Sequence, residues 1–322
     1  MNKQGFGLPV PMPVAVLLVA ALGAASPAYA ARHYVCRHYA HHRRICRPYL
    51  YRPDRAADRR ITASHPYVRS SEALVFDATR SRVLYAKRAA GVTPIASITK
   101  LMTTLVVAEA HQPLDQALTV TRADMTPYSH LPLGARLTRA QFFHLALMSS
   151  ENRAAHVLAR NYPGGVGAAV RAMNAKARAL GMTHTHFVEP TGLSAGDVST
   201  PDDLAKLVLA ASHNRILRRY STSAGYAIRV GRWRLPYYPT DPLVRDRWWH
   251  IVLQKTGFTD PAGQCLVLDA WIAHHDIIVV LMHSWGQYTR TADAMRVRQW
   301  VERRFARLRD QTVAGDPASR HS

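Results

Sequence analysis

The order of the strand-like segments constrains the fold of this 322-residue chain more than any other feature. Two short runs rich in apolar and β-branched residues, 73–76 and 82–85, precede a long helical block. Three further strand-like runs follow that block, at 249–254, 265–272 and 277–283. A single sheet interrupted by an inserted helical block explains this order. The sequence therefore predicts an α/β (α+β) fold with five strands in one sheet.

Capping signals indicate where several helices of the block begin and end. Thr138 followed by Gln141 forms a capping box ahead of an apolar run. Gly181 is placed to end a helix that starts near residue 166, and Thr200 precedes a proline at the first position of another helix. A final amphipathic helix over 291–308 completes the domain.

Residues 1–30 have the pattern of an export signal. Lys3 supplies a positive start, an apolar run covers 14–25, and Ala28-Tyr29-Ala30 forms a small-residue cleavage site. The apolar run is too short for a bilayer span, which argues against an anchor. We expect an exported, periplasmic protein that has no integral membrane span.

Between Ala31 and Arg60 the chain is rich in arginine, histidine and tyrosine, with nine arginines against two aspartates. Such a segment buries too little apolar surface to order itself, so we expect 31–71 to be largely disordered. In an exported protein its charge favours an anionic envelope polymer over nucleic acid, and a solvated linker is the alternative. Catalytic residues are then expected within 72–310, ahead of a disordered tail at 311–322.

Export also makes disulfide bonds permissible. Cys36 and Cys46 lie close enough in sequence to close a small loop, but sequence does not establish that they pair. Cys265 stands in an apolar run and is interpreted as a buried thiol.

Ser97 and Lys100 lie at the start of an apolar helix-like stretch, three residues apart and hence on one helix face. A serine hydroxyl needs a base to become a nucleophile, and a partly buried lysine with a lowered pKa can serve. Only six of the 42 Lys and Arg residues are lysine, so a lysine here is notable. Arginine cannot readily give up its proton, whereas lysine can.

Two further clusters follow in the order that this chemistry requires. Ser150-Glu151-Asn152 comes at the end of an apolar helix, and Lys255-Thr256-Gly257 comes at the end of a strand-like run. The patterns S-x-x-K, S-x-N and K-T-G in this order form the signature of penicillin-binding proteins and class A β-lactamases. Each cluster alone could be a helix cap or a loop, but all three together predict a serine acyl-transfer site.

The longer runs around these motifs resemble the D-alanyl-D-alanine endopeptidases, low-molecular-mass penicillin-binding proteins of the penicillin-binding-protein-7 type in serine peptidase family S11. The resemblance extends over about 72–308, and its specific runs are 94–100, 148–154, 187–194 and 255–267. It implies a serine β-lactamase/DD-transpeptidase-like fold, in which an antiparallel five-stranded sheet is flanked by helices and joined to an all-helical subdomain. It also implies peptidoglycan stem peptides as substrates and β-lactams as covalent inhibitors.

The chemistry assigns a role to each motif residue. Ser97 is the nucleophile, Lys100 is the general base, Ser150 relays a proton, and Asn152 orients Lys100 and the substrate amide. The substrate-binding residues are Lys255 as a positive charge, Thr256 as a hydrogen-bonding hydroxyl, Gly257, which leaves a bare strand edge, and Phe258. By the resemblance, the backbone N–H groups of Ser97 and Phe258 form the oxyanion hole.

Three other functions were weighed against the endopeptidase. A carboxypeptidase that removes terminal D-alanine shares the motifs. A β-lactamase would need a deacylating glutamate, but Glu189 does not stand in the matching E-x-x-L-N pattern. A non-catalytic wall-binding protein is disfavoured because every motif residue is present. No cofactor or metal site is expected, since His184-Thr185-His186 has no third ligand nearby in the sequence.

Overall fold

The computed structural model describes residues 33–38, 44–49, 61–62, 64–286 and 288–314. The chain divides into two compact units, Met1–Tyr49 and Leu50–Ser322. The predicted signal at 1–30 lies outside the described residues, as does most of the predicted tail.

In the first unit, two strands form an antiparallel pair, β1 (His33–His38) and β2 (Arg44–Tyr49). This pair differs from the largely disordered segment expected between Ala31 and Arg60. The strands contain β-branched residues such as Val35 and Ile45, which favour extended structure. Cys36 stands opposite Cys46 in the register, and their pairing remains a prediction.

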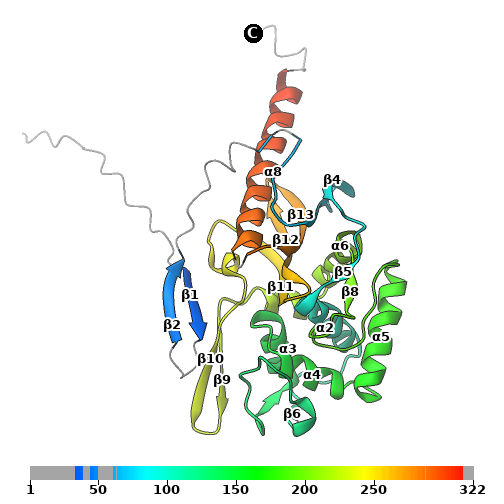
Figure 1. Cartoon of the computed structure of the whole chain (residues 1–322), viewed down its shortest axis with the longest axis vertical. Helices are drawn as coiled ribbons and strands as arrows, with labels where there is room; N and C mark the ends of the chain where they lie inside the picture. The colour runs from blue at the N-terminus through cyan, green and yellow to red at the C-terminus, as the bar shows by residue number, and fades with distance from the viewer. Residues whose placement is uncertain (1–32, 39–43, 50–60, 63, 287, 315–322) are drawn as a thin grey trace, which may run out of the picture. The chain divides into compact units, whose positions relative to one another are not determined.

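The second unit is built on one antiparallel sheet of five strands, in the order β11-β12-β13-β3-β4 (Figure 1). Both segments around the helical block contribute, because β3 pairs with β13. The strands are β3 (Glu72–Asp77), β4 (Arg82–Lys87), β11 (His250–Thr259), β12 (Gly263–Ile272) and β13 (His275–Ser284). The prediction of one sheet interrupted by helices is confirmed.

Side chains alternate between the two faces of the sheet along each strand, and both faces are buried. On one face, Val280 and its neighbours pack against the helical block. On the other face, Leu281 and Val75 pack against Trp300 and Val301 of α8 (Thr289–Ala314). This helix extends beyond the predicted 291–308, so the first residues of the predicted tail are helical.

The helical block lies between β4 and β11, with α2 at its centre. Every residue from Thr99 to Ala108 in α2 is buried, as expected for a helix surrounded by others. The helices are α2 (Thr99–Glu109), α3 (Arg139–Met148), α4 (Asn152–Arg160), α5 (Gly165–Ala179), α6 (Pro201–Ser212) and α7 (Arg215–Ser221).

Short strand pairs and 3-10 turns connect these helices. The pairs are β5 (Thr93–Pro94) with β8 (Val198–Ser199), β6 (Ala117–Thr119) with β7 (Arg136–Thr138), and β9 (Tyr226–Val230) with β10 (Trp233–Tyr237). The turns are η1 (Ala96–Ile98), η2 (Arg122–Asp124) and η3 (Pro242–Arg245).

The predicted helix caps match the structure. The Thr138 side chain accepts from the Gln141 N–H and completes a capping box for α3. The Thr200 side chain caps α6 by accepting from the Asp203 N–H. Gly181 follows the end of α5 and has φ at +69°. Across the described part of the chain, the helices are all too short or too polar to cross a bilayer.

One buried carboxyl group makes the stability of the sheet depend on pH. Asp269 on β12 is 1% exposed and lies beside Asp276 and Ser212. Burial raises the pKa of Asp269 to about 8, and Asp276 contributes to the rise. In the unfolded chain an aspartate has a pKa of about 3.9. The protonated form therefore stabilises the fold, and this contribution is lost as pH rises from about 4 to about 8.

We predict that Asp269→Asn flattens this decline, because an amide has no proton to lose. Thermal unfolding of the two proteins should show a gain in melting temperature for the variant that is larger at pH 8.5 than at pH 5. The exposed Asp260→Asn serves as a control that should follow wild type throughout. An equal difference at both pH values would contradict the prediction.

Candidate active site

Ser97 lies in η1, a single 3-10 turn that leads into α2. The sequence suggested that the α-helix opens near Ser97, but α2 begins at Thr99, and its N-cap, Ile98, forms no side-chain cap bond. The Ser97 hydroxyl is therefore not used as a helix cap. The preceding residue, Ala96, has φ at +47°, a strained conformation for a residue with a side chain.

Two glycines hold this strained turn in place from either side. A Cβ atom on Gly192 would lie 1.9 Å from the Ala96 carbonyl oxygen and 2.8 Å from the Ser97 nitrogen. A Cβ on Gly257 would lie 2.9 Å from the Ile95 carbonyl oxygen and 3.1 Å from the Ser97 nitrogen. The nucleophile's backbone thus touches two other backbones with no side chain between them. The sequence explained Gly257 only as a bare edge for substrate.

Lys100 joins the nucleophile to the helical block. Its Nζ lies 2.7 Å from Ser97 Oγ, 2.7 Å from Asn152 Oδ1 and 2.6 Å from the Thr191 carbonyl oxygen. Lys100 is fully buried. Asn152 and Thr191 thus direct the amine towards Ser97, and a neutral Lys100 can accept the hydroxyl proton from that position.

Burial lowers the pKa of Lys100 to about 7, against the opposing pull of Glu189, Glu151 and Asp197. Burial, the cause that the sequence predicts, is the dominant one. At neutral pH a substantial fraction of Lys100 is therefore unprotonated and able to act as a base.

Ser150 and Asn152 stand at the junction of α3 and α4. Ser150 adopts φ of +59°, which turns the chain sharply between the two helices. Asn152 is the first residue of α4. Its side-chain amide N–H donates to the Pro127 carbonyl oxygen, and its Oδ1 accepts from Lys100 Nζ. The structure thus brings Asn152 to Ser97 through Lys100.

Lys255 connects Ser150 to the sheet through a hydrogen bond. Its Nζ lies 2.8 Å from Ser150 Oγ and 2.7 Å from the Thr256 carbonyl oxygen. Burial lowers the pKa of Lys255 well below its ordinary value, and the charges of Lys100 and Arg290 add to this effect. Burial thus disfavours the positive charge that the sequence predicts at Lys255.

Lys255, Thr256 and Gly257 lie inside β11 rather than at its end, because β11 continues to Thr259. β11 is an edge strand of the sheet, so one side of it is open to pairing with a peptide. The Thr256 hydroxyl lies 2.5 Å from that of Thr240, and Phe258 is 56% exposed.

Several residues of the site had no sequence signal of their own. Thr191 contributes through its backbone oxygen, which any residue could supply. Arg290 is buried and donates to the carbonyl oxygens of Gly257 and Cys265, which fixes β11 against β12. In a chain with 36 arginines, nothing marked Arg290 out.

Glu189 holds the loop that carries Thr191 and Gly192. Its carboxylate accepts from the Thr191 N–H and hydroxyl, and from the N–H groups of Leu193 and Ser194. Burial alone would raise the pKa of Glu189, but these hydrogen bonds outweigh it and leave the pKa below its ordinary value. Burial and the Glu189 charge raise the pKa of the neighbouring Asp197 to about 7.

No group of three or more metal-ligating side chains occurs among the residues that the structure describes. His184 and His186 are exposed, and the backbone N–H of His184 donates to Asp203.

A buried lysine beside a serine, with a second serine and lysine across the cleft, defines a serine acyl-transfer enzyme. The profile of the D-alanyl-D-alanine carboxypeptidase family, peptidase family S11, matches residues 59–285. A D-alanyl-D-alanine endopeptidase of Escherichia coli (strain K12) is 44% identical over 248 residues, which cover 75% of this chain and 80% of the relative. The chain therefore belongs to peptidase family S11, and the predicted family is confirmed.

Solved structures agree with this assignment. The crystal structure of the Streptomyces K15 DD-transpeptidase aligns with a TM-score of 0.68 and 25% identity, covering 72% of this chain and 97% of that one. Penicillin-binding protein D2 from Listeria monocytogenes, in an ampicillin-bound form, aligns with a TM-score of 0.65 and 26% identity, covering 73% and 97%. The predicted DD-transpeptidase-like fold is confirmed.

The close contact at Gly192 gives a test of the site that does not depend on substrate. We predict that Gly192→Ala displaces η1 and slows acylation of Ser97 by a general serine-reactive reagent at least about tenfold, because the added methyl group overlaps Ala96. Acylation would be followed by mass spectrometry, and folding by thermal unfolding.

Gly134→Ala is the matched control. Gly134 has nearly the same φ, +80° against +81° for Gly192, but a Cβ there would meet nothing within 4 Å. Both variants bear the cost of a left-handed alanine, about 1 kcal/mol, and only Gly192→Ala should lose reactivity. Equal reactivity of the two variants would show that the Gly192 contact does not position Ser97.

Proposed function

We propose that this protein is a serine DD-endopeptidase that cleaves D-alanyl crosslinks in peptidoglycan through an acyl-enzyme on Ser97. The observation that carries the chemistry is the 2.7 Å contact between Ser97 Oγ and the fully buried Lys100 Nζ. The substrate class rests on the similarity to the E. coli endopeptidase.

Acylation follows from the contacts in the cleft. Neutral Lys100 accepts the Ser97 proton as Oγ attacks the carbonyl carbon of a D-alanyl peptide bond. The Ser97 and Phe258 N–H groups are the proposed donors to the developing oxyanion, where one donor is worth about 10²–10³ in rate. As the C–N bond breaks, Ser150 donates a proton to the leaving amine. Lys255, 2.8 Å away, can then restore a proton to Ser150.

Because burial lowers the pKa of Lys255, a bound substrate would also change the protonation of this residue. An arriving substrate carboxylate near Lys255 and Thr256 would favour the protonated amine, since an opposite charge nearby stabilises the charged form. A bound carboxylate would therefore favour the protonated Lys255 that proton transfer to Ser150 requires. Water next attacks the ester carbonyl and gives one proton through Ser150 to Lys255, while Lys100 returns its proton to Ser97 Oγ as the ester C–O bond breaks and the acid product is released.

The alternative activity is a DD-carboxypeptidase that removes a terminal D-alanine. The family profile takes its description from that reaction. The endopeptidase is favoured because the 44% identical relative with 80% coverage is an endopeptidase. A peptide can also extend along the open edge of β11 on both sides of the scissile bond.

A β-lactamase activity is disfavoured by the surroundings of Glu189. Its carboxylate is occupied by hydrogen bonds from its own loop, which leaves it poorly placed to activate a water molecule. We therefore propose that a β-lactam acylates Ser97 and is released slowly. The ampicillin-bound state of the Listeria protein supports β-lactams as ligands of this fold.

The cellular setting is also proposed. The pattern of residues 1–30 supports export to the periplasm, where peptidoglycan lies. The positive charge between Ala31 and Arg60 supports an anionic envelope polymer as a further contact.

Purified muropeptides test the activity. Incubation with a soluble crosslinked dimer should yield monomers, while uncrosslinked pentapeptide should lose D-alanine at least about tenfold more slowly, because a single terminal residue makes fewer contacts along β11. Ser97→Ala should abolish cleavage, and chromatography of the products gives the measurement. Release of terminal D-alanine alone would establish the carboxypeptidase instead.

The pKa of Lys100 predicts the pH dependence of acylation. Lys100 acts as a base only when neutral, so the rate of labelling by a fluorescent penicillin should rise with pH through about 7 and then level off. Ser97→Ala should take no label, and Lys100→Arg should lose at least about 10²-fold in rate. Rapid loss of label from wild type would indicate a β-lactamase, and absence of label would favour a non-catalytic binding protein.

A further inference from the structure

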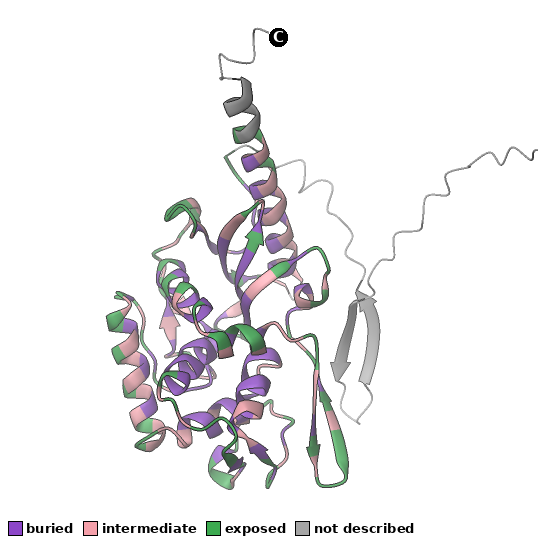
Figure 2. Cartoon of the chain, turned by 180° about the vertical axis from the view of Figure 1, so that it is seen from behind, coloured by how far each residue is buried: buried purple, intermediate pink, exposed green. Residues whose placement is uncertain are grey.

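A two-stranded hairpin, β9 with β10, stands apart from the main sheet. Within the described part of the chain its strands form a two-stranded sheet of their own, which runs alongside the helical block (Figures 1 and 2). The part of the hairpin nearest its turn is exposed, including Arg229, Arg232, Trp233 and Arg234. Trp233 is 63% exposed. Isolated two-stranded hairpins are marginally stable, so a hairpin kept in this form calls for an explanation.

The charges on this hairpin are not balanced within the described part of the chain. Arg229 and Arg234 stand directly opposite each other in the register, and like charges at such a position are destabilising. The Arg232 guanidinium lies 5.0 Å from the centroid of the Trp233 ring. The ion pairs of the described residues include none of these three arginines. An anionic partner would remove the repulsion.

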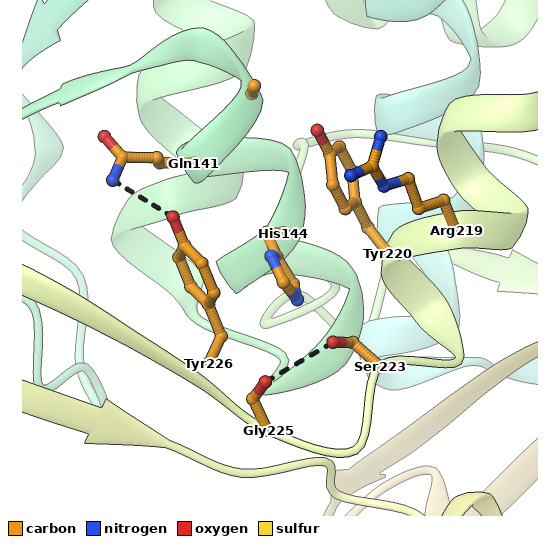
Figure 3. Close-up of a pocket in the computed structure, with 8 residues that line it drawn as sticks. Gln141, His144, Arg219, Tyr220, Ser223, Gly225 and Tyr226 are labelled. Carbon is orange, nitrogen blue, oxygen red and sulfur yellow. Dashed lines mark hydrogen bonds between the residues drawn. The ribbon is translucent and has the colours of Figure 1, made fainter.

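The base of the hairpin is firmly attached to α3. The Gln141 amide donates to the Tyr226 hydroxyl at 3.1 Å, and the His144 ring stacks on Tyr226 at 4.0 Å (Figure 3). Tyr220 stacks on the other side of His144 at 4.9 Å. Burial, aided by the charge of Arg219, lowers the pKa of His144 to about 4. A neutral histidine between two tyrosines thus fixes the first residue of β9.

These residues also line a cavity of about 400 Å³ between α3, α7 and the start of β9. We assign it no ligand, because its rings are already stacked on one another.

The second strand of the hairpin ends at the same base, where Tyr237 pairs with Tyr226. Beyond β10, the Thr240 N–H donates to the Met148 carbonyl oxygen at 3.1 Å, and the Thr240 hydroxyl lies 2.5 Å from that of Thr256. Thr240 therefore joins the hairpin to the substrate-binding part of β11. The arginines lie near the turn, at the opposite end of the hairpin from these attachments.

We propose that the β9–β10 hairpin is a docking surface for peptidoglycan beyond the crosslink that is cut. This inference rests on the proposed function. Stem peptides carry carboxylates that arginine binds in a bidentate manner, and the face of an exposed tryptophan can pack against a sugar ring. An anionic membrane is the less suitable partner, because the exposed part of the hairpin offers one large apolar side chain, Trp233. The surface raises the local concentration of polymer and leaves the chemistry unchanged.

The test compares two full-length variants that remove the same charge. The hairpin variant changes Arg229, Arg232 and Arg234 to alanine. The control changes three exposed arginines on β7 and α5, Arg136, Arg171 and Arg178, to alanine. Each is assayed for sedimentation with intact sacculi at increasing salt, for cleavage of sacculi, for cleavage of the soluble crosslinked dimer, and for labelling by fluorescent penicillin.

The hairpin variant should bind and cleave sacculi about tenfold less well than wild type at low salt, with a weaker salt dependence, because three exposed ion pairs are lost. Its labelling and its cleavage of the dimer should stay within about twofold of wild type, which also shows that it is folded. The control variant should follow wild type. Trp233→Ala, with its charges intact, should weaken sacculus binding by about threefold with unchanged salt dependence.

The proposal would be overturned if the hairpin variant bound sacculi as well as wild type does. It would also be overturned if the control variant lost as much sacculus binding as the hairpin variant. Binding to phosphatidylglycerol vesicles would be measured as well. The proposal would also be overturned if the three arginines were needed for vesicle binding and not for sacculus binding. Failure of the proposed function would be seen separately, as a wild-type protein that neither takes the label nor cleaves the soluble dimer.

Discussion

The active site depends on one contact, in which three stretches of backbone meet at η1. The turn that carries Ser97 is pressed between Gly192 of the 189–194 loop and Gly257 of β11, and neither position has room for a side chain. The positive φ of Ala96 is sustained by this enclosure. The contact also brings the carbonyl oxygen of Thr191 to Lys100, so the loop that fixes the nucleophile's backbone also fixes the base. Glu189 stabilises this arrangement because its carboxylate accepts hydrogen bonds from the same loop.

Burial then determines the protonation of both lysines. Lys100 and Lys255 are each fully buried, and each binds a serine of the site, Ser97 or Ser150. Desolvation lowers both pKa values, but only Lys100 has three carboxylates near enough to oppose the effect. The two residues therefore differ in their readiness to carry charge because of their surroundings, although they are chemically the same. An arginine at either position would stay charged and could not act in this way.

The sequence predicted the architecture well because its signals were local and mutually consistent. The strand order, the Thr138 capping box and the Thr200 cap each depend on a few adjacent residues. The motif residues could be recognised because the signal lies in their side-chain types and order, and the structure brings Ser97 to Lys100 and Ser150 to Lys255. Thr191, Arg290 and Gly192 were missed because they act through backbone atoms or through close packing, which only the folded chain brings about. The extent of β11 past Gly257 and the low pKa of Lys255 were missed for the same reason, since both depend on neighbours distant in sequence.

The pairing of β3 with β13 has a consequence for how the enzyme becomes active. This pairing joins the first strand of the domain to the last, so Val75 finds its partner Val279 only when almost the whole domain has been made. Contacts of this kind close long loops and form slowly compared with helices. Ser97 and Lys100 lie close together in η1 and α2, whereas Lys255 and Gly257 belong to a strand that follows the whole helical block. The part of the chain that carries Ser97 is therefore synthesised well before the strand that completes its site.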